Sequence, residues 1–180
     1  MIFTETQIPG AFVVDIDPKA DDRGFFARAW DVEEFAAHGL STVLVQGNLS
    51  FNRTTGTLRG MHFQRPPHEE AKLVRCTRGA IYDVVIDLRP DSPAFKRWVG
   101  LEVTAENRRA LYVPEGCGHG YQTLADATET FYLVSAAYAP ESEGGVRWDD
   151  PAFAIEWPHA EPRVLSPKDA SWPDFEPLAA

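Results

Sequence analysis

Short apolar runs separated by turn residues recur along the chain from residue 41 to residue 135. The runs are rich in β-branched and aromatic residues, and Gly, Pro, Asn or Asp stand between them. Short strands at this spacing are typical of a β-sandwich or a β-barrel, so we expect a mainly β protein. The strands are predicted at 41–48, 57–63, 71–77, 80–88, 97–103, 109–113, 118–124 and 128–135.

The run AIYDVVIDL, residues 80–88, alternates most regularly. Asp83 and Asp87 share one face with Ile81 and Val85, whereas the other face is apolar or aromatic. Carboxylates at every second position indicate either that this face lines a wet cavity or that it is the solvated outer face of a sheet.

Two segments depart from the strand pattern. A short helix is predicted near the N-terminus, where Asp31 can cap it, Glu34 stands in the capping-box position and Gly39 ends it. After residue 138 the chain becomes rich in Pro and Trp, through residue 158. This segment is too aromatic for a disordered tail, so we expect it to pack on the barrel or on a partner subunit.

Composition narrows the class of protein. With 180 residues, 44% of them apolar and 24% charged, the chain is expected to form one ordered domain, 1–180. No apolar run reaches the roughly 20 residues of a membrane-spanning helix, and the N-terminus lacks a signal-peptide layout. Cys76 and Cys117 are expected to be free thiols, which together with these features predicts a cytoplasmic protein without a membrane partner.

The formal net charge of −10 argues against nucleic acid as a partner. An anionic ligand would therefore have to be held by local clusters of Arg and Lys.

The segment TLRGMHFQRPPHEEAKLVRC, residues 57–76, is dense in residues that can bind metals. A metal-binding cupin would place a second histidine two residues after His62, but this chain has Gln64 there. His68 is predicted to lie in a loop, and only His119 has a plausible place on a later strand. We therefore expect no metal at this site.

An acid/base site requires fewer specific residues than a metal site. It needs a histidine that titrates near neutral pH, a cation that stabilises negative charge, and a second proton carrier. His62 and Lys72 supply the first two on neighbouring predicted strands. Strict alternation would put Arg59 and His62 on opposite faces, but a bulge at Gly60 would turn both inward.

Nine motifs carry a resemblance to a known family. They are RGFF at 23–26, QGN at 46–48, LRGMHFQ at 58–64, KLVRCTRG at 72–79, VVIDLRPDSPAFKRWVG at 84–100, PEGCGHGY at 114–121, FYLVSAAYAP at 131–140, EGGVRWDDP at 143–151 and LSPKD at 165–169. In this order they resemble the dTDP-4-dehydrorhamnose 3,5-epimerase family. The resemblance implies a cupin jelly-roll barrel that uses no metal or other cofactor. It also implies a homodimer with exchanged N-terminal strands, and epimerisation of nucleotide-linked 4-keto-6-deoxy hexoses.

The same resemblance implies four catalytic residues. His62 would remove the proton next to the keto group, and Asp169 would hold and polarise its imidazole. Lys72 would stabilise the enolate oxygen, and Tyr132 would return a proton from the opposite face. Two acid/base groups on opposite faces are what a non-redox inversion requires.

The nucleotide diphosphate would be bound mainly by cations, because guanidinium groups match phosphate oxygens in geometry. The contacts that the resemblance implies are Arg23, Arg59 and Lys168, then Gln46, Asn48, His119 and Glu143, with Tyr138 as a stacking surface for the base.

One position departs from the family pattern. After RGFF the family usually has a glutamate that contacts the nucleotide, whereas this chain has Ala27 and then Arg28. A donor thus replaces an acceptor at a nucleotide contact. CDP or another nucleotide in place of dTDP is therefore an alternative.

We expect a nucleotide-sugar epimerase that acts at C3, at C5 or at both carbons of an NDP-4-keto-6-deoxy hexose through an enolate. A C3-only epimerase or a ketoisomerase on a CDP-linked or other NDP-linked 4-keto sugar is the alternative within this class. A non-catalytic sugar-binding cupin and a metal-dependent cupin are the alternatives from other classes.

Overall fold

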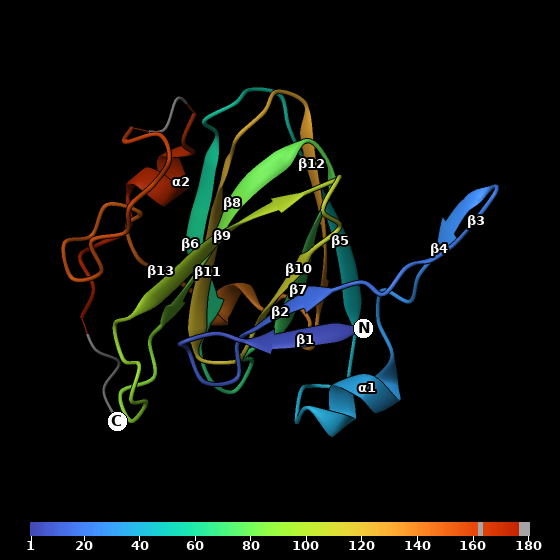
Figure 1. Cartoon of the computed structure of the whole chain (residues 1–180). Coiled ribbons are helices and arrows are strands. Elements are labelled where there is room, and N and C mark those ends of the chain that lie inside the picture. The colour runs from blue at the N-terminus through green and yellow to red at the C-terminus, as the bar shows by residue number, and fades with distance from the viewer. Residues whose placement is uncertain (162–163, 177–180) are drawn as a thin grey trace.

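The computed structural model describes residues 1–161 and 164–176, which form mostly strands (Figure 1). The elements are β1 (Ile2–Glu5), β2 (Phe12–Asp15), β3 (Lys19–Asp21), β4 (Gly24–Phe26), α1 (Val32–Ala37), β5 (Gln46–Asn52), β6 (Leu58–Gln64), β7 (Lys72–Arg78), β8 (Ala80–Asp87), β9 (Trp98–Thr104), β10 (Ala110–Val113), β11 (Cys117–Thr123), β12 (Thr128–Val134), the 3₁₀ helix η1 (Pro140–Ser142), β13 (Glu143–Gly145) and α2 (Pro167–Ala170).

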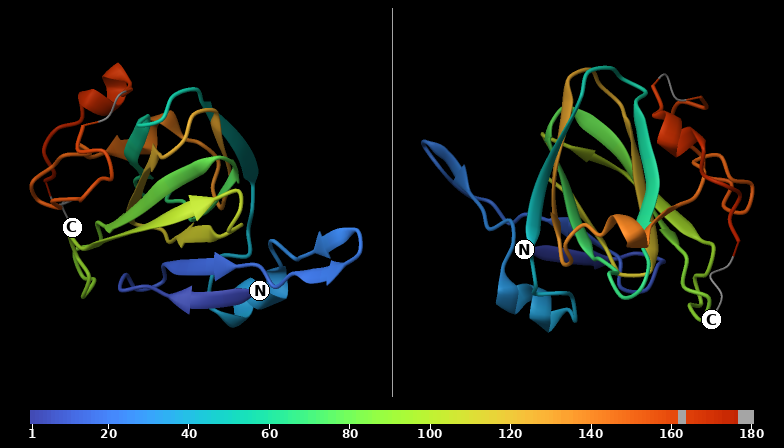
Figure 2. Two further views of the ribbon diagram at one scale, coloured as in Figure 1. Left: turned by 45° about the horizontal axis from the view of Figure 1, so that its top comes forward. Right: turned by 180° about the vertical axis from the view of Figure 1, so that it is seen from behind.

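Two antiparallel sheets face each other and build a cupin jelly roll, as predicted (Figures 1 and 2). The six-stranded sheet has the order β1-β2-β10-β7-β12-β5, and the five-stranded sheet has the order β13-β6-β11-β8-β9. Strands that follow one another in the chain often lie in different sheets, so residues from distant segments meet between them.

Both faces of the five-stranded sheet are covered. On the inner face, Val85 packs with Leu111 of the six-stranded sheet. On the outer face, Val84 and Ile86 pack in one cluster with Phe153 and Trp157. The C-terminal segment therefore packs on the barrel, which confirms one of the two predicted positions.

The carboxylates of β8 do not face solvent. Asp83 and Asp87 are both 0% exposed, and they lie on the strand face opposite the C-terminal segment. Asp83 hydrogen-bonds to His119, and Asp87 pairs with Arg89 at 2.7 Å. The alternative of a solvated outer face is wrong, because the outer face of this strand is the apolar one.

The N-terminal helix forms where it was predicted. The Asp31 carboxylate accepts hydrogen bonds from the backbone N–H groups of Glu33 and Glu34, at 3.0 and 3.1 Å. Gly39 follows the helix with φ of +70°, a conformation that glycine adopts without strain. Phe35 anchors the helix under the six-stranded sheet, packed with Tyr112.

The first predicted strand is displaced. The run 41–48 was expected to form it, whereas β5 occupies Gln46–Asn52. Its seven residues pair with β12 from Val134 opposite Gln46 to Thr128 opposite Asn52. Pairing with this neighbour outweighs the weak strand preference of Gly and Asn in β5, and the apolar residues before it form no strand.

Four strands near the N-terminus were not predicted: β1, β2, β3 and β4. The first two extend the six-stranded sheet, and the other two form a separate hairpin. This hairpin projects away from the barrel (Figure 1) and exposes 45% of Phe25 and 70% of Phe26.

Cys76 and Cys117 are free, as expected, and both are buried. Burial raises the pKa of the Cys76 thiol to about 11 and that of Cys117 to about 12, so both are protonated and unreactive near neutral pH. Within the described ranges, none of the helices combines the length and the apolar character needed to span a membrane.

Candidate active site

His62 and Asp169 form a hydrogen-bonded pair between β6 and α2. The His62 Nε2 atom lies 2.7 Å from Asp169 Oδ1, and the side chains are 33% and 6% exposed. Ser166 caps α2 by accepting a hydrogen bond from the Asp169 N–H at 3.0 Å, which fixes the aspartate. Burial raises the pKa of Asp169, but the hydrogen bond and charge of His62, together with hydrogen bonds from the Gly60 N–H and Ser166, outweigh burial, so the pKa lies below its ordinary value. Asp169 is thus an anion that orients the imidazole.

A bulge at Gly60 brings Arg59 and His62 to the same side of β6, as predicted. His62 lies opposite His119 and Arg59 lies opposite Tyr121, so β6 has one residue more than β11 between these pairs. Gly60 has φ of +138°, and a Cβ atom there would lie 2.5 Å from Gly120 Cα. Only glycine fits this bend without strain.

Gly60→Ala should therefore lower the free energy of unfolding by about 3 kcal/mol, from backbone strain and the clash with β11. Urea denaturation measures this loss. Gly39→Ala is the matched control: its φ is also positive, but nothing lies within 4 Å of the added methyl group. Equal losses of unfolding free energy in the two variants would show that the close contact between Gly60 and Gly120 adds nothing to the cost of the substitution.

Lys72 and Tyr132 face His62 from the other sheet. Lys72 lies on β7 and is 8% exposed, and its Nζ atom lies 3.1 Å from Glu70 Oε1. Tyr132 lies on β12. Burial raises the pKa of Tyr132, Tyr121 and Glu70 raise it further, and Arg59 opposes them. Tyr132 therefore keeps its proton near neutral pH and can donate it.

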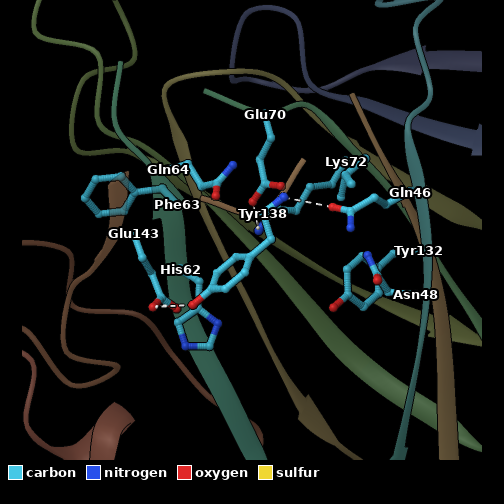
Figure 3. A pocket seen from close by; sticks show the side chains of 11 residues that line it. Gln46, Asn48, His62, Phe63, Gln64, Glu70, Lys72, Tyr132, Tyr138 and Glu143 are labelled. Carbon is cyan, nitrogen blue, oxygen red and sulfur yellow. Dashed lines mark hydrogen bonds and ion pairs between the residues drawn. The ribbon is translucent and has the colours of Figure 1, made fainter. Parts of the chain in front are cut away.

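Two adjoining cavities share His62, Lys72 and Tyr132. The larger cavity, of about 440 Å³, is shown in Figure 3. Its other lining residues are Gln46, Asn48, Phe63, Gln64, Glu70, Val134, Tyr138 and Glu143. The smaller cavity, of about 150 Å³, is lined in addition by Ser50, Arg59, His119 and Tyr121. Three of the four predicted catalytic residues thus border both cavities. The fourth, Asp169, is hydrogen-bonded to His62.

Tyr138 reaches across the larger cavity toward Glu143 (Figure 3). Its backbone N–H donates to Gln46 Oε1 at 2.8 Å, and its hydroxyl donates to Glu143 Oε2 at 3.0 Å. The other Glu143 oxygen binds the Lys168 ammonium group at 2.5 Å. Four predicted nucleotide contacts are therefore connected to one another, and Tyr138, which is 57% exposed as a residue, is accessible for stacking.

Two predicted nucleotide contacts lie elsewhere. Arg23 follows β3, is 90% exposed and pairs with Asp21. Arg28 follows β4 and pairs with Asp31 at 2.6 Å. Both belong to the region of the hairpin that leaves the barrel (Figure 1), so the structure does not bring them to the cavities of their own chain.

The three histidines of the metal-dependent alternative do not form one ligand set: His62 and His119 both line the smaller cavity, but His68 lines neither cavity. Each imidazole has a different partner: Asp169 for His62, Asp83 for His119 at 2.7 Å, and Ser142 for His68 at 2.9 Å. Throughout residues 1–161 and 164–176, no three His, Cys, Asp or Glu side chains gather as metal ligands would.

Three polar residues of the site were not among the predicted catalytic or nucleotide-binding residues. Glu70 contacts Lys72, and Asp83 contacts His119. Gln64, 4% exposed, bonds to backbone groups on both sides of Tyr138, at 3.2 Å to the Ala137 carbonyl and 2.7 Å to the Ala139 N–H. The alternation of β8 signals an inward Asp83, and Glu70 stands two residues before Lys72. The sequence carries no comparable signal for Gln64.

The architecture defines a class: a cupin jelly roll whose interior holds an imidazole–carboxylate pair on one sheet and a lysine and a tyrosine on the other. The model of the dTDP-4-dehydrorhamnose 3,5-epimerase family matches residues 5–177, and the chain belongs to this family.

Individual relatives agree in sequence and in fold. The dTDP-4-dehydrorhamnose 3,5-epimerase of Salmonella typhimurium strain LT2 is 41% identical over 174 residues, 96% of this chain and 94% of that protein. The dTDP-4-dehydrorhamnose 3-epimerase of Streptomyces niveus is 42% identical over 163 residues, 90% of this chain and 78% of that protein. The crystal structure of the 3,5-epimerase from Bacillus anthracis strain Ames, with TDP and PPi bound, is 40% identical, with a TM-score of 0.92 and coverage of 97% of this chain and 99% of that one.

Proposed function

We propose that the protein epimerises a nucleotide-linked 4-keto-6-deoxy hexose, such as dTDP-4-dehydro-6-deoxy-glucose, at C3, at C5 or at both carbons. One observation carries this proposal. His62 on β6 and Tyr132 on β12 belong to facing sheets and line the same two cavities. A base and an acid on opposite sides of a bound sugar are the groups that an inversion without redox chemistry needs.

In the proposed reaction, His62 takes the proton from the carbon next to the ketone, and the electron pair moves to the ketone oxygen. Since Nε2 is bonded to Asp169, Nδ1 is the ring atom that accepts the proton. Asp169 stabilises the imidazolium ion, and Lys72 stabilises the enolate oxygen. Tyr132 then delivers a proton to the other face of the same carbon, and the centre is inverted.

The nucleotide part would occupy the larger cavity. Gln46, Asn48, Tyr138 and Glu143 line it, and Lys168 pairs with Glu143. Arg59 and His119 line the smaller cavity, so we place them near the sugar and the phosphate attached to it. Names of relatives contain dTDP, and one related structure holds TDP, which favours thymidine as the base. Titration calorimetry with dTDP and CDP, on the protein and on Arg28→Glu, tests this choice.

A homodimer would complete the site. By strand alternation, Leu49, Phe51 and Phe131 point away from the cavity face that carries Asn48 and Tyr132, and they are 62%, 45% and 37% exposed. An exposed apolar sheet face of this kind suits a second copy of the chain. The projecting hairpin could then carry Arg23 to the partner's cavity.

Mixing two inactive variants should restore activity if Arg23 acts across the dimer. In a dimer of Arg23→Ala with His62→Asn, one site has both changes and the other has neither. After unfolding and refolding an equal mixture, about one quarter of the wild-type activity should return. Each variant alone, refolded in the same way, is the control. A mixture no more active than its components would contradict the exchange of the hairpin.

Proton exchange tests the reaction directly. Candidate 4-keto sugars are incubated with the protein in deuterated water and followed by NMR. Deuterium at C3 alone indicates a single epimerase, and deuterium at C3 and C5 indicates a double epimerase. Binding of the sugar nucleotide with deuterium at neither carbon would indicate a binding protein and would overturn the proposal. Loss of activity together with metal on chelation would support the metal-dependent alternative.

A further inference from the structure

Arg59 is oriented by a hydrogen bond to the buried side-chain amide of Asn52. Its Nε–H donates to the Asn52 side-chain oxygen at 2.7 Å, and Asn52 is 2% exposed. Nε is the guanidinium atom nearest the side-chain stem, so this bond sets the plane of the whole group. The two Nη atoms have no hydrogen-bond partner among the residues that the structure describes. They remain available to a ligand in the smaller cavity.

A polar network fixes Asn52 in turn. Its amide N–H groups donate to the Tyr121 hydroxyl at 3.2 Å and to the Thr128 carbonyl at 3.4 Å. The Tyr121 hydroxyl also lies 3.1 Å from Ser50 Oγ and 3.4 Å from Thr130 Oγ1. These residues come from β5 and β12 of one sheet and from β11 of the other. The network therefore joins the two sheets at the back of the smaller cavity.

We propose that Asn52, supported by Tyr121, is a positioning residue that aims the Arg59 guanidinium group at an anionic oxygen of the ligand. The proposal rests on the proposed function, in which that oxygen belongs to the diphosphate of the nucleotide sugar. Asn52 itself need not touch the substrate.

Because Asn52 is neutral, its hydrogen bond leaves the positive charge of Arg59 available to a ligand. Five arginines in the described part of this acidic chain are paired with carboxylates, among them Arg89 with Asp87 and Arg109 with Asp15. Among the described residues, Arg59 forms no ion pair, and its hydrogen-bond partner is the neutral Asn52. An amide orients the guanidinium group without cancelling its charge, whereas a carboxylate at position 52 would orient it and cancel the charge.

Two substitutions separate orientation from charge. Asn52→Leu removes the hydrogen bond, and Asn52→Asp keeps an acceptor but adds a negative charge. We expect Asn52→Leu to raise the Kd of dTDP and of pyrophosphate about tenfold, the effect of one hydrogen bond to a charged group. Asn52→Asp should raise both at least as much. Tyr121→Phe, which removes only a supporting hydroxyl, should raise them about threefold. Calorimetry measures both ligands, and thermal melting verifies that each variant is folded.

A double-mutant cycle provides the decisive result. If Asn52 acts through Arg59, Asn52→Leu combined with Arg59→Gln binds no more weakly than Arg59→Gln alone. The inference would be overturned if the increases in Kd of the two single variants multiply in the double variant, or if Asn52→Leu binds like the wild type. Asn107→Leu is the matched control, because Asn107 also makes three hydrogen bonds but lies in the β9–β10 loop. It should change Kd by less than about twofold.

Pyrophosphate has neither base nor sugar, which keeps this test separate from the proposed function. If the wild-type protein binds pyrophosphate and dTDP but exchanges no proton, the proposed epimerase function fails. The role of Asn52 is then still decided by the variants.

Discussion

His62→Asn should abolish proton exchange and lower kcat by about three to four orders of magnitude, the upper range for loss of a general base. Asparagine places its amide atoms at the δ position, where the proposed base atom Nδ1 of histidine lies, but the amide cannot accept a proton near neutral pH. Substrate affinity should change little, because the cavity keeps its shape and its cations. NMR in deuterated water measures exchange at C3 and C5, and calorimetry with dTDP measures binding.

The same substitution at another histidine gives the control. His38 is exposed beyond α1, where its ring stacks on Phe3 at 4.0 Å, far from both cavities. His38→Asn should exchange protons at the wild-type rate. If His62→Asn did so too, a different residue would be the base, and the pairing of His62 with Asp169 would be structural.

The fold was largely readable from the alternation of apolar and polar residues. Seven of the eight predicted strands overlap strands of the structure closely, since burial of one or both faces dictates their pattern. The strand corresponding to β5 was predicted too early in the chain, because the sequence QGNLSFN has little strand preference and depends on β12 for its pairing. The β3–β4 hairpin was missed since it buries no face in its own chain and therefore carries no alternating pattern.

The site was readable only in part. The bulge at Gly60 follows from a glycine inside a strand, and it correctly joins Arg59 to His62. The contact of His62 with Asp169 spans 107 positions of the sequence, so no local spacing could indicate it, and it was predicted through the family resemblance alone. The contact of Asn52 with Arg59 escaped prediction for another reason. It depends on the turn between β5 and β6, whose first strand was misplaced.

Because His62 and Tyr132 lie on facing sheets, loss of one residue should affect the reaction differently from loss of the other. A base alone can remove a proton and return a solvent-derived one on the same face, which exchanges hydrogen without changing configuration. Inversion needs a donor on the other face. Loss of the donor should therefore affect inversion much more than exchange.

Tyr132→Phe should accordingly lower the rate of inversion by about 10²- to 10³-fold while His62 continues to exchange the substrate proton at a measurable rate. Both rates come from one NMR experiment in deuterated water: loss of the substrate C–H signal reports exchange, and the coupling constants of the product report configuration. The ratio of exchange to inversion should rise by at least tenfold over wild type.

Tyr112→Phe is the matched control. Tyr112 is buried, and burial raises its pKa as it raises that of Tyr132, but its hydroxyl accepts a hydrogen bond from the Ser41 N–H, and it lines neither of the two cavities that Tyr132 lines. This variant should invert normally. If Tyr132→Phe reduced exchange and inversion by the same factor, Tyr132 would act before the enolate forms, for example in binding the sugar. Separation of the two rates in Tyr132→Phe alone would locate the acid on the face opposite His62.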